Sequence, residues 1–100
     1  MAIALTSKQR AHLRSLAQTT RATLQIGKEG LTPEVTAAVE EAFNTRELVK
    51  LTALKTVDGD LREIGDTLAG RTHSTLVEVI GRKIVLYRQD PDDPQIRLPR

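Results

Sequence analysis

The chain has no cysteine, hardly any aromatic residues and no long apolar segment. Its 100 residues include one Phe, one Tyr and no Trp. The absence of cysteine excludes a disulfide scaffold, a thiolate metal site and a cysteine nucleophile. No apolar run approaches the roughly 18 residues of a membrane-spanning helix, and the apolar start, residues 1–5, is shorter than the core of a signal peptide. We therefore expect a cytoplasmic protein that has no contact with a membrane.

The size and composition of the chain fit a single small domain over residues 1–100. Apolar residues make up 39% of the chain and charged residues 28%. Folding at this length removes roughly 60–70% of the chain's surface from water, which supports one core but not a deep substrate cavity. A large enzyme pocket and a small-molecule substrate are disfavoured for that reason.

Charge is distributed unevenly along the chain, although the net charge is only +2. Residues 1–30 carry five basic and one acidic side chain, residues 31–70 carry four and eight, and residues 71–100 carry six and four. This polarity favours a basic surface for a polyanion and an acidic surface turned away from it. The alternative is that the charges only keep a small domain soluble.

Hydrophobic periodicity predicts seven elements in the order α-β-α-β-α-β-β. The predicted helices span about residues 7–18, 33–43 and 61–69, and the predicted strands span residues 22–26, 48–54, 75–80 and 83–88. The long connection between the first two strands contains a helix, so these strands should be parallel. Gly81-Arg82 is typical of a tight turn between antiparallel strands. We expect a compact α/β domain with a four-stranded mixed sheet packed with helices, followed by an irregular tail at residues 89–100.

The sequence shows no pattern of catalytic or metal-binding residues. His12 and His73 lie far apart, and neither has a second ligand at metal-binding spacing. The run from Arg71 to Thr75 contains a base and hydroxyl groups, but neighbours on an extended segment point to opposite faces. We therefore expect no enzyme activity, no metal and no cofactor, and nothing in the spacing supports a minimal nuclease.

The turn Gly27-Lys28-Glu29-Gly30 is the most informative short motif. It lies between a predicted strand and a predicted helix that Thr32 and Pro33 begin. Glycines let backbone N–H groups approach a phosphate, and a helix start adds unpaired N–H groups and the positive end of its dipole. The alternative is a plain turn that requires a positive φ.

Taken together, these features resemble the CRM domain, the chloroplast RNA splicing and ribosome maturation module, and especially its stand-alone bacterial form, the YhbY-like family. The residues that carry the resemblance are Leu5 to Arg10 with Leu13 and Ala17, Ile26 to Thr32, Glu47 to Lys50, Val79 to Gly81, Ile84 to Arg88, and Leu98-Pro99. The resemblance implies the α-β-α-β-α-β-β fold, similar to the C-terminal domain of translation initiation factor three, and a GxxG loop like that of KH domains. It also implies binding to ribosomal RNA of the precursor of the large (50S) ribosomal subunit.

The predicted RNA-binding residues lie in this loop and in the basic segments of the chain. They are Gly27, Lys28, Glu29, Gly30, Lys8, Arg10, Arg14, Arg82, Lys83 and Arg88. Glu29 departs from the basic or neutral residue that would suit a phosphate better. For Arg82 and Lys83 the alternative is a solubilising hairpin tip, and for Tyr87 and Arg88 it is cross-strand packing.

The leading hypothesis is a non-catalytic RNA-binding protein, favoured as a monomer, that assists ribosome biogenesis. With so few aromatic side chains, we expect contacts mainly to sugar and phosphate. The alternative from another class is a protein-interaction adaptor, in which the acidic helix from Glu34 to Phe43 docks on a ribosomal protein or an assembly factor.

Overall fold

The computed structural model describes residues 4–100, so the first three residues of the apolar start lie outside the described part. The elements follow the predicted order: α1 (Ser7–Thr19), β1 (Leu24–Ile26), α2 (Pro33–Phe43), β2 (Leu48–Ala53), α3 (Leu61–Arg71), β3 (Thr75–Ile80) and β4 (Lys83–Tyr87). Within residues 4–100, no helix has the length and apolar character needed to cross a membrane.

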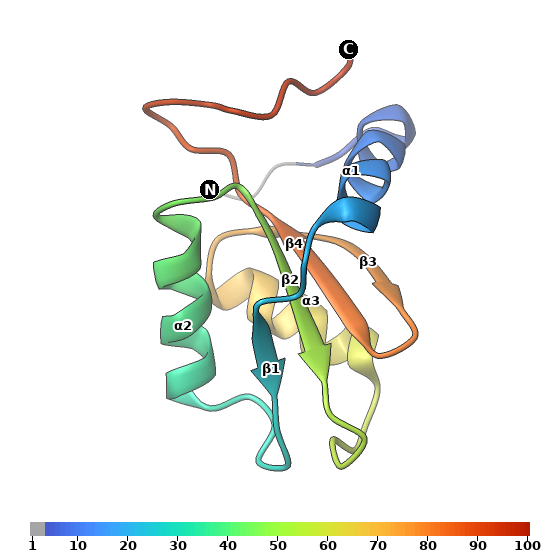
Figure 1. Ribbon diagram of the computed structural model, residues 1–100, viewed down its shortest axis with the longest axis vertical. Helices are drawn as coiled ribbons and strands as arrows, with labels where there is room; N and C mark the ends of the chain where they lie inside the picture. Colours follow the sequence, from blue (N-terminus) through green and yellow to red (C-terminus); the bar gives the residue numbers. More distant parts are fainter. Residues whose placement is uncertain (1–3) are drawn as a thin grey trace.

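The four strands form one mixed sheet in the order β1-β2-β4-β3 (Figure 1). β1 pairs with β2 in parallel, and β4 pairs antiparallel with both β2 and β3. The predicted α/β fold with a mixed sheet is therefore confirmed. β1 is shorter than predicted, with three residues in the sheet.

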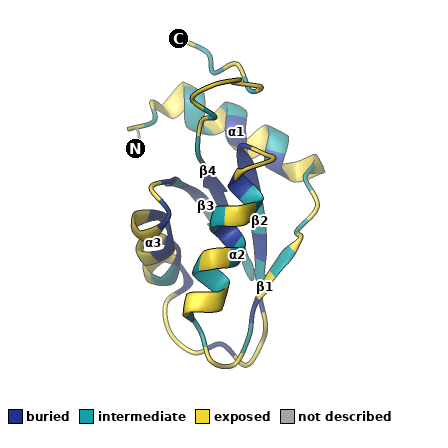
Figure 2. Ribbon diagram, turned by 90° about the vertical axis from the view of Figure 1, so that its left-hand side faces the viewer, coloured by how far each residue is buried: buried dark blue, intermediate teal, exposed yellow. Residues whose placement is uncertain are grey.

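The sheet lies between two helical layers. α2 and α3 cover one face, where Val39, Phe43 and Leu68 pack against strand residues such as Leu51 and Ile84. α1 covers part of the other face, called here the α1 face, where Leu13 and Ala17 pack on Leu48, Val85 and Tyr87. Figure 2 shows α1 at the end of the sheet nearest the C-terminal tail, so it leaves the opposite end of that face without a helix.

Side-chain caps explain where the helices begin. Thr6 and Gln9 form the predicted capping box of α1, in which each side chain pairs with the other residue's backbone N–H. Thr32 caps α2, with Pro33 in the first turn, and Asp60 caps α3. These local contacts satisfy backbone groups that helix starts leave unpaired.

Three connections meet at one end of the sheet, called here the loop end. They are the turn at residues 27–30, the loop at residues 54–60 and the hairpin tip at residues 81–82. Parallel β1 and β2 both point toward this end, and Lys83 at the start of β4 pairs with Thr52 near the end of β2. Gly81 has a φ of 58°, which fits the first position of a type II′ turn.

The tail after β4 contains no helix or strand but lies on the body of the domain. The Glu47 side chain is only 4% exposed, and its carboxylate accepts hydrogen bonds from the backbone N–H groups of Asp90, Gln95 and Ile96 at 2.7–2.8 Å. Ile96 and Leu98 pack against the cluster beneath α1. The tail therefore completes the core at the end opposite the loop end.

Candidate nucleic-acid interface

The turn at residues 27–30 is closed by one hydrogen bond and presents two charged side chains. The Gly30 N–H donates to the Gly27 carbonyl at 2.9 Å, and Lys28 and Glu29 are exposed at the tip. Gly30 has a φ of 71°, a conformation that residues with a Cβ rarely adopt. Because the Gly30 N–H is used within the turn, the backbone donors that can face a phosphate are those of the tip residues.

Gly27 is held under a different constraint from Gly30. A Cβ at Gly27 would lie 4.0 Å from Leu54 Cδ1, which is ordinary van der Waals contact. The conformation of the turn therefore requires glycine at residue 30 only. At residue 27 the protein leaves room for a side chain, so neither packing nor backbone conformation requires glycine there.

The start of α2 offers fewer donors than its position after a glycine turn predicts. Pro33 has no N–H, the Val35 N–H donates to Thr32 Oγ1 at 3.2 Å, and the Thr36 N–H donates to the Thr32 carbonyl at 3.1 Å. Glu34 adds a negative charge in the first turn. An anion at this loop would therefore be held mainly by the tip of the turn and by the Lys28 side chain.

The neighbouring loop at residues 54–60 is tied to the turn and to the hairpin tip. The Leu54 N–H donates to the Ile26 carbonyl at 2.9 Å. The Arg82 guanidinium donates to the carbonyls of Ala53 and Val57, each at 3.2 Å, and also to that of Leu54. Arg82 thus joins the hairpin tip to the end of β2 and the loop after it, and acts as a positioning residue.

Lys83, Arg14 and Lys8 keep their charged groups on the surface of the domain. Lys83 lies on the α1 face, and its Nζ donates to Thr52 Oγ1 at 2.7 Å. Arg14 is exposed on α1 and lines a hollow between the helix and β3. Lys8 is exposed in the first turn of α1, and Figure 1 shows α1 at the end of the domain opposite the connection between β1 and α2.

Arg10 uses its guanidinium inside the protein. Nη1 donates to the carbonyls of Leu76 at 2.7 Å and Val77 at 2.5 Å. The pairing of β3 with β4 shifts register between Leu76 and Glu78, so these carbonyls belong to a β-bulge. Arg10 therefore holds α1 against the irregular part of an edge strand.

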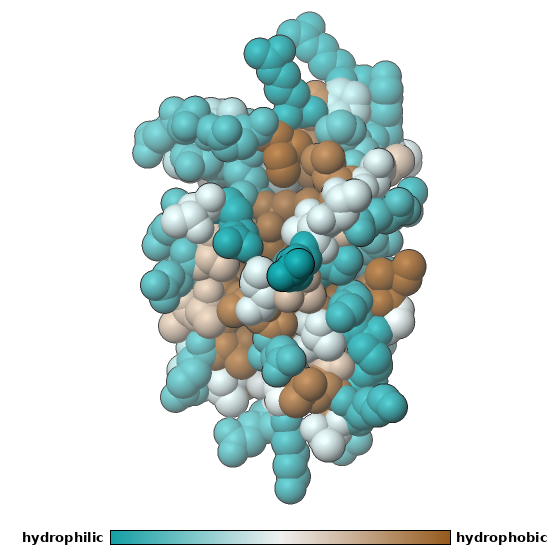
Figure 3. All heavy atoms as spheres, in the orientation of Figure 1, coloured by the Kyte–Doolittle hydropathy of each residue, from teal (hydrophilic) through white to brown (hydrophobic). Residues whose placement is uncertain are grey.

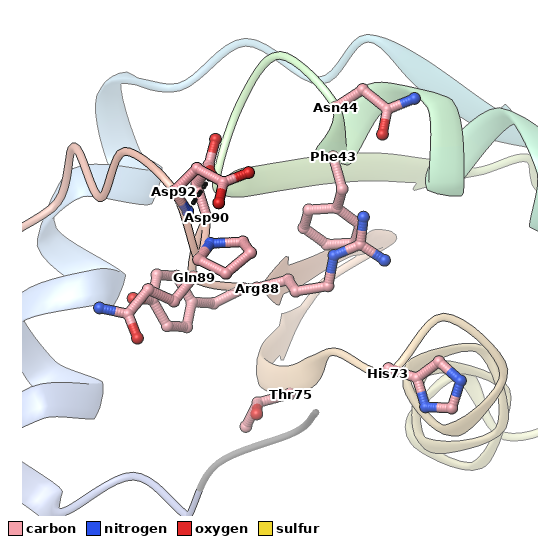
Figure 4. Close-up of a pocket in the computed structure, with 10 residues that line it drawn as sticks. Phe43, Asn44, His73, Thr75, Arg88, Gln89, Asp90 and Asp92 are labelled. Atoms are coloured by element: carbon pink, nitrogen blue, oxygen red, sulfur yellow. Dashed lines mark hydrogen bonds between the residues drawn. The ribbon is translucent and has the colours of Figure 1, made fainter.

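Arg88 lies on the side of the sheet that α2 covers. Its Nη1 is 2.9 Å from Glu40 Oε2 and donates to the Thr72 carbonyl, and the guanidinium lies 4.7 Å from the centre of the Phe43 ring. Figure 4 shows this stacked pair in the wall of a hollow of about 580 Å³. The structure thus separates Arg88 from the glycine turn and gives it a packing role.

Both aromatic side chains are buried. Phe43 belongs to the core beneath α2, and Tyr87 is 1% exposed in the core beneath α1. Burial raises the pKa of Tyr87 above its ordinary value of 10.0, and the nearby charge of Glu47 raises it further. Neither ring can stack on a base at the surface, which fits contacts to sugar and phosphate.

The two helical layers carry opposite charge. α1 has three basic and no acidic residues, whereas α2 and α3 together have five acidic and two basic residues. Lys50, which the sequence reasoning did not assign to the site, adds a cation to the α1 face. Its place in the alternation Leu48, Lys50, Thr52 could have indicated this position, because alternate strand residues share a face.

Comparison with known proteins identifies the family to which this fold belongs. A family model described as the CRS1/YhbY (CRM) domain matches residues 5–88. The chain belongs to the CRM domain family. Among its relatives, "Probable RNA-binding protein YqeI" of Bacillus subtilis is 36% identical over 95% of this chain and 99% of its own length. "Probable RNA-binding protein PA4753" of Pseudomonas aeruginosa is 33% identical over 89% of this chain and 86% of its own length.

A solved structure shows the same CRM fold. The solution structure of the hypothetical protein SAV1595 of Staphylococcus aureus, described as a proposed RNA-binding protein, has a TM-score of 0.83 and 38% identity. The match covers 96% of this chain and all of that chain. The relatives named above and this solved structure are each described as RNA-binding proteins.

Proposed function

We propose that this protein binds ribosomal RNA and acts during assembly of the large ribosomal subunit, in the cytoplasm and without catalytic turnover. The carrying observation is the exposed turn at residues 27–30, which presents Lys28 at the loop end of a domain whose α1 layer is basic. RNA binding is the property named for the relatives in Bacillus and Pseudomonas. The ribosomal target extends that property to a particular RNA.

The arrangement of the acidic and histidine side chains is the reason why binding rather than catalytic turnover is proposed. Within residues 4–100, no group of three or more His, Cys, Asp or Glu side chains is arranged to hold a metal ion. In the hollow of Figure 4, His73 lies apart from Asp90 and Asp92, so an acid and a base do not meet there. Recognition of the RNA backbone needs only cations and backbone donors, which the surface provides.

The acidic helix of the adaptor hypothesis is less available than its sequence indicates. Glu40 is paired with Arg88, while Glu34 and Glu41 remain exposed on α2. The charge of this helix is therefore partly used to hold the end of β4. The opposite layer keeps Lys8 and Arg14 exposed on α1, so RNA binding through that layer is the preferred proposal.

Crosslinking in cells tests the proposal. We expect ultraviolet crosslinks to map to large-subunit ribosomal RNA and to depend on Lys28 and Arg14, so the Lys28→Ala/Arg14→Ala variant should lose most of them. Arg71→Ala, on the acidic side of the domain, should keep them. Crosslinks confined to other RNAs would contradict the ribosomal target. Retention of a protein partner after nuclease treatment, without any crosslinked RNA, would favour the adaptor.

A further inference from the structure

One half of the α1 face has no helix over it. Strand register brings five side chains together there, called here the open sheet face: Gln25, Lys50, Thr52, Ile80 and Lys83. Gln25 pairs with Thr52, Thr52 pairs with Lys83, and Lys83 pairs with Ile80, so this face crosses all four strands. The apolar residues under α1 lie toward the other end of the same strands.

The open sheet face is accessible and mostly polar. Gln25 is exposed, and Ile80 is 60% exposed, although it is a large apolar residue in a strand. Figure 3, which views the domain from this side, shows hydrophilic side chains over most of the surface with smaller apolar patches between them. A face of this kind suits a partner that offers both charge and some apolar surface.

Two ammonium groups are fixed on this face by contacts with the protein. Lys83 Nζ donates to Thr52 Oγ1 at 2.7 Å, and Lys50 Nζ donates to the Ala17 carbonyl at 2.9 Å. Lys50 and Thr52 are two residues apart on one strand, so their Cα atoms lie about 7 Å apart along it. A lysine ammonium has three donors, and each of these bonds uses one. The remaining donors can bind oxygen atoms of a ligand.

A hollow of about 370 Å³ continues the open sheet face toward α1. It is lined by Arg14, Ala17, Gln18, Lys50, Glu78 and Ile80. Glu78 is the one acidic residue in this lining, against Arg14 and Lys50. With Lys83 beside them, the cations outnumber the acid, and charge complementarity favours a polyanion.

The glycine turn is the direct continuation of this face along β1. Gln25 lies two residues before Gly27, which corresponds to about 7 Å of strand. An RNA strand that places one phosphate at the turn would therefore pass next over Gln25, Thr52 and Lys83. With no aromatic ring on this surface, the contacts available are ionic and hydrogen-bonding contacts to the backbone, plus apolar contact with Ile80.

We propose that the open sheet face, together with Arg14, binds the sugar–phosphate backbone of a single RNA strand that continues from the glycine turn. This inference rests on the proposed function and specifies the path of the RNA. Phosphates bind Lys83, Lys50 and Arg14 in turn, while Gln25 and Thr52 offer hydrogen bonds to the sugars. The contacts follow the backbone, so they are independent of base sequence.

The salt dependence of RNA affinity tests the proposed path. The probe is a single-stranded fragment of large-subunit ribosomal RNA, and the variant is Arg14→Gln/Lys83→Gln. Loss of two phosphate contacts should weaken binding about tenfold at physiological salt and make the slope of log affinity against log salt shallower by about 1.4. Arg71→Glu is the matched control, because it changes net charge by the same two units on α3. It should keep the wild-type slope.

The outcomes separate this inference from the proposed function. If Lys28→Gln weakens binding while Arg14→Gln/Lys83→Gln retains the wild-type affinity and slope, the path over the sheet is wrong and the turn alone binds. An equal loss in Arg71→Glu would also overturn the path, since the effect would then follow net charge. If the wild-type protein does not bind the RNA, both proposals fall. Should the double variant be poorly folded, Arg14→Gln alone, at an exposed position, should show half the slope change.

Discussion

The guanidinium of Arg82 holds the loop after β2 in place by donating to the carbonyl of Ala53, the last residue of β2, and to two loop carbonyls, those of Leu54 and Val57. Lysine keeps the charge but lacks the planar fork that reaches several acceptors at once. We expect Arg82→Lys to lower the free energy of unfolding by about 1–2 kcal/mol, as measured by urea denaturation. Arg71→Lys, on an exposed helix end, should leave it unchanged. If Arg82→Lys leaves stability unaltered and Arg82→Ala weakens RNA binding, the role of Arg82 is a charge contact with RNA and not the positioning of the loop.

Tyr87 carries a buried hydroxyl that has no hydrogen-bond partner within residues 4–100. Replacing it by phenylalanine removes the cost of burying this group, so Tyr87→Phe should raise the free energy of unfolding by up to about 1 kcal/mol at neutral pH. In the wild type, Tyr87 has its ordinary pKa of 10.0 in the unfolded chain and a higher pKa in the folded protein.

The sign of the pH dependence follows from that difference. Above pH 10.0 the unfolded state binds fewer protons than the folded state at Tyr87, so wild-type stability falls as pH rises toward the folded pKa. In Tyr87→Phe the part of this alkaline loss of stability that comes from Tyr87 should be absent. Urea denaturation curves of the two proteins at increasing alkaline pH would measure the difference. Parallel alkaline losses in the two proteins would contradict it.

The roles of the arginines show what residue-level prediction could not reach. The sequence correctly indicates which segments are basic, but Arg10, Arg82 and Arg88 make their contacts with residues 16 to 67 positions away in the chain. Their acceptors are largely backbone carbonyls, which every residue has, so no spacing in the sequence marks them. Lys28, at the tip of a local turn, could be placed because the glycines on either side define the turn.

At the scale of elements, α3 approaches the sheet closely at Gly65. A Cβ there would lie 2.9 Å from Leu76 Cδ1 and 3.3 Å from Ile84 Cγ2. These side chains are buried in the main core, so they have little room to move. The glycine that weakens the helical pattern in the sequence is explained by packing.

Two glycine-to-alanine substitutions in α3 test this explanation. Both gain helix propensity, but only Gly65→Ala meets a crowded site, since a Cβ at Gly70 has nothing within 4 Å. We expect Gly70→Ala to raise the free energy of unfolding by up to about 1 kcal/mol. The free energy of unfolding of Gly65→Ala should be about 1–3 kcal/mol lower than that of Gly70→Ala. Chemical denaturation of both variants gives the difference. Equal stabilisation would mean that α3 has room at Gly65.

The order of elements could be predicted because each one carries a local signal. Capping residues indicate the helix starts, alternation indicates the strands, and Gly81 indicates the hairpin turn. The bulge near Val77 and the uncovered half of the sheet could not be predicted in this way. Both depend on where α1 lies on the sheet, and that position is set by packing between distant residues.

At the scale of the whole molecule, the uneven charge of the sequence becomes two layers of opposite sign. The basic α1 layer and the loop end offer cations to phosphate, whereas α2 and α3 would repel it. If about three to five phosphates are contacted, the slope of log affinity against log salt should be roughly −2 to −4. Titration of RNA binding over a series of salt concentrations measures this slope. A flat dependence would argue against recognition of the RNA backbone.

The most direct test of where RNA binds is a nuclear magnetic resonance titration of isotope-labelled protein with a ribosomal RNA fragment. The account predicts shifts of backbone amide signals in the glycine turn and across the open sheet face, at Lys28, Glu29, Thr52 and Lys83. Signals of α2 and of the exposed side of α3, around Glu63, should stay in place. Shifts confined to α2 and α3, with the glycine turn unchanged, would contradict it.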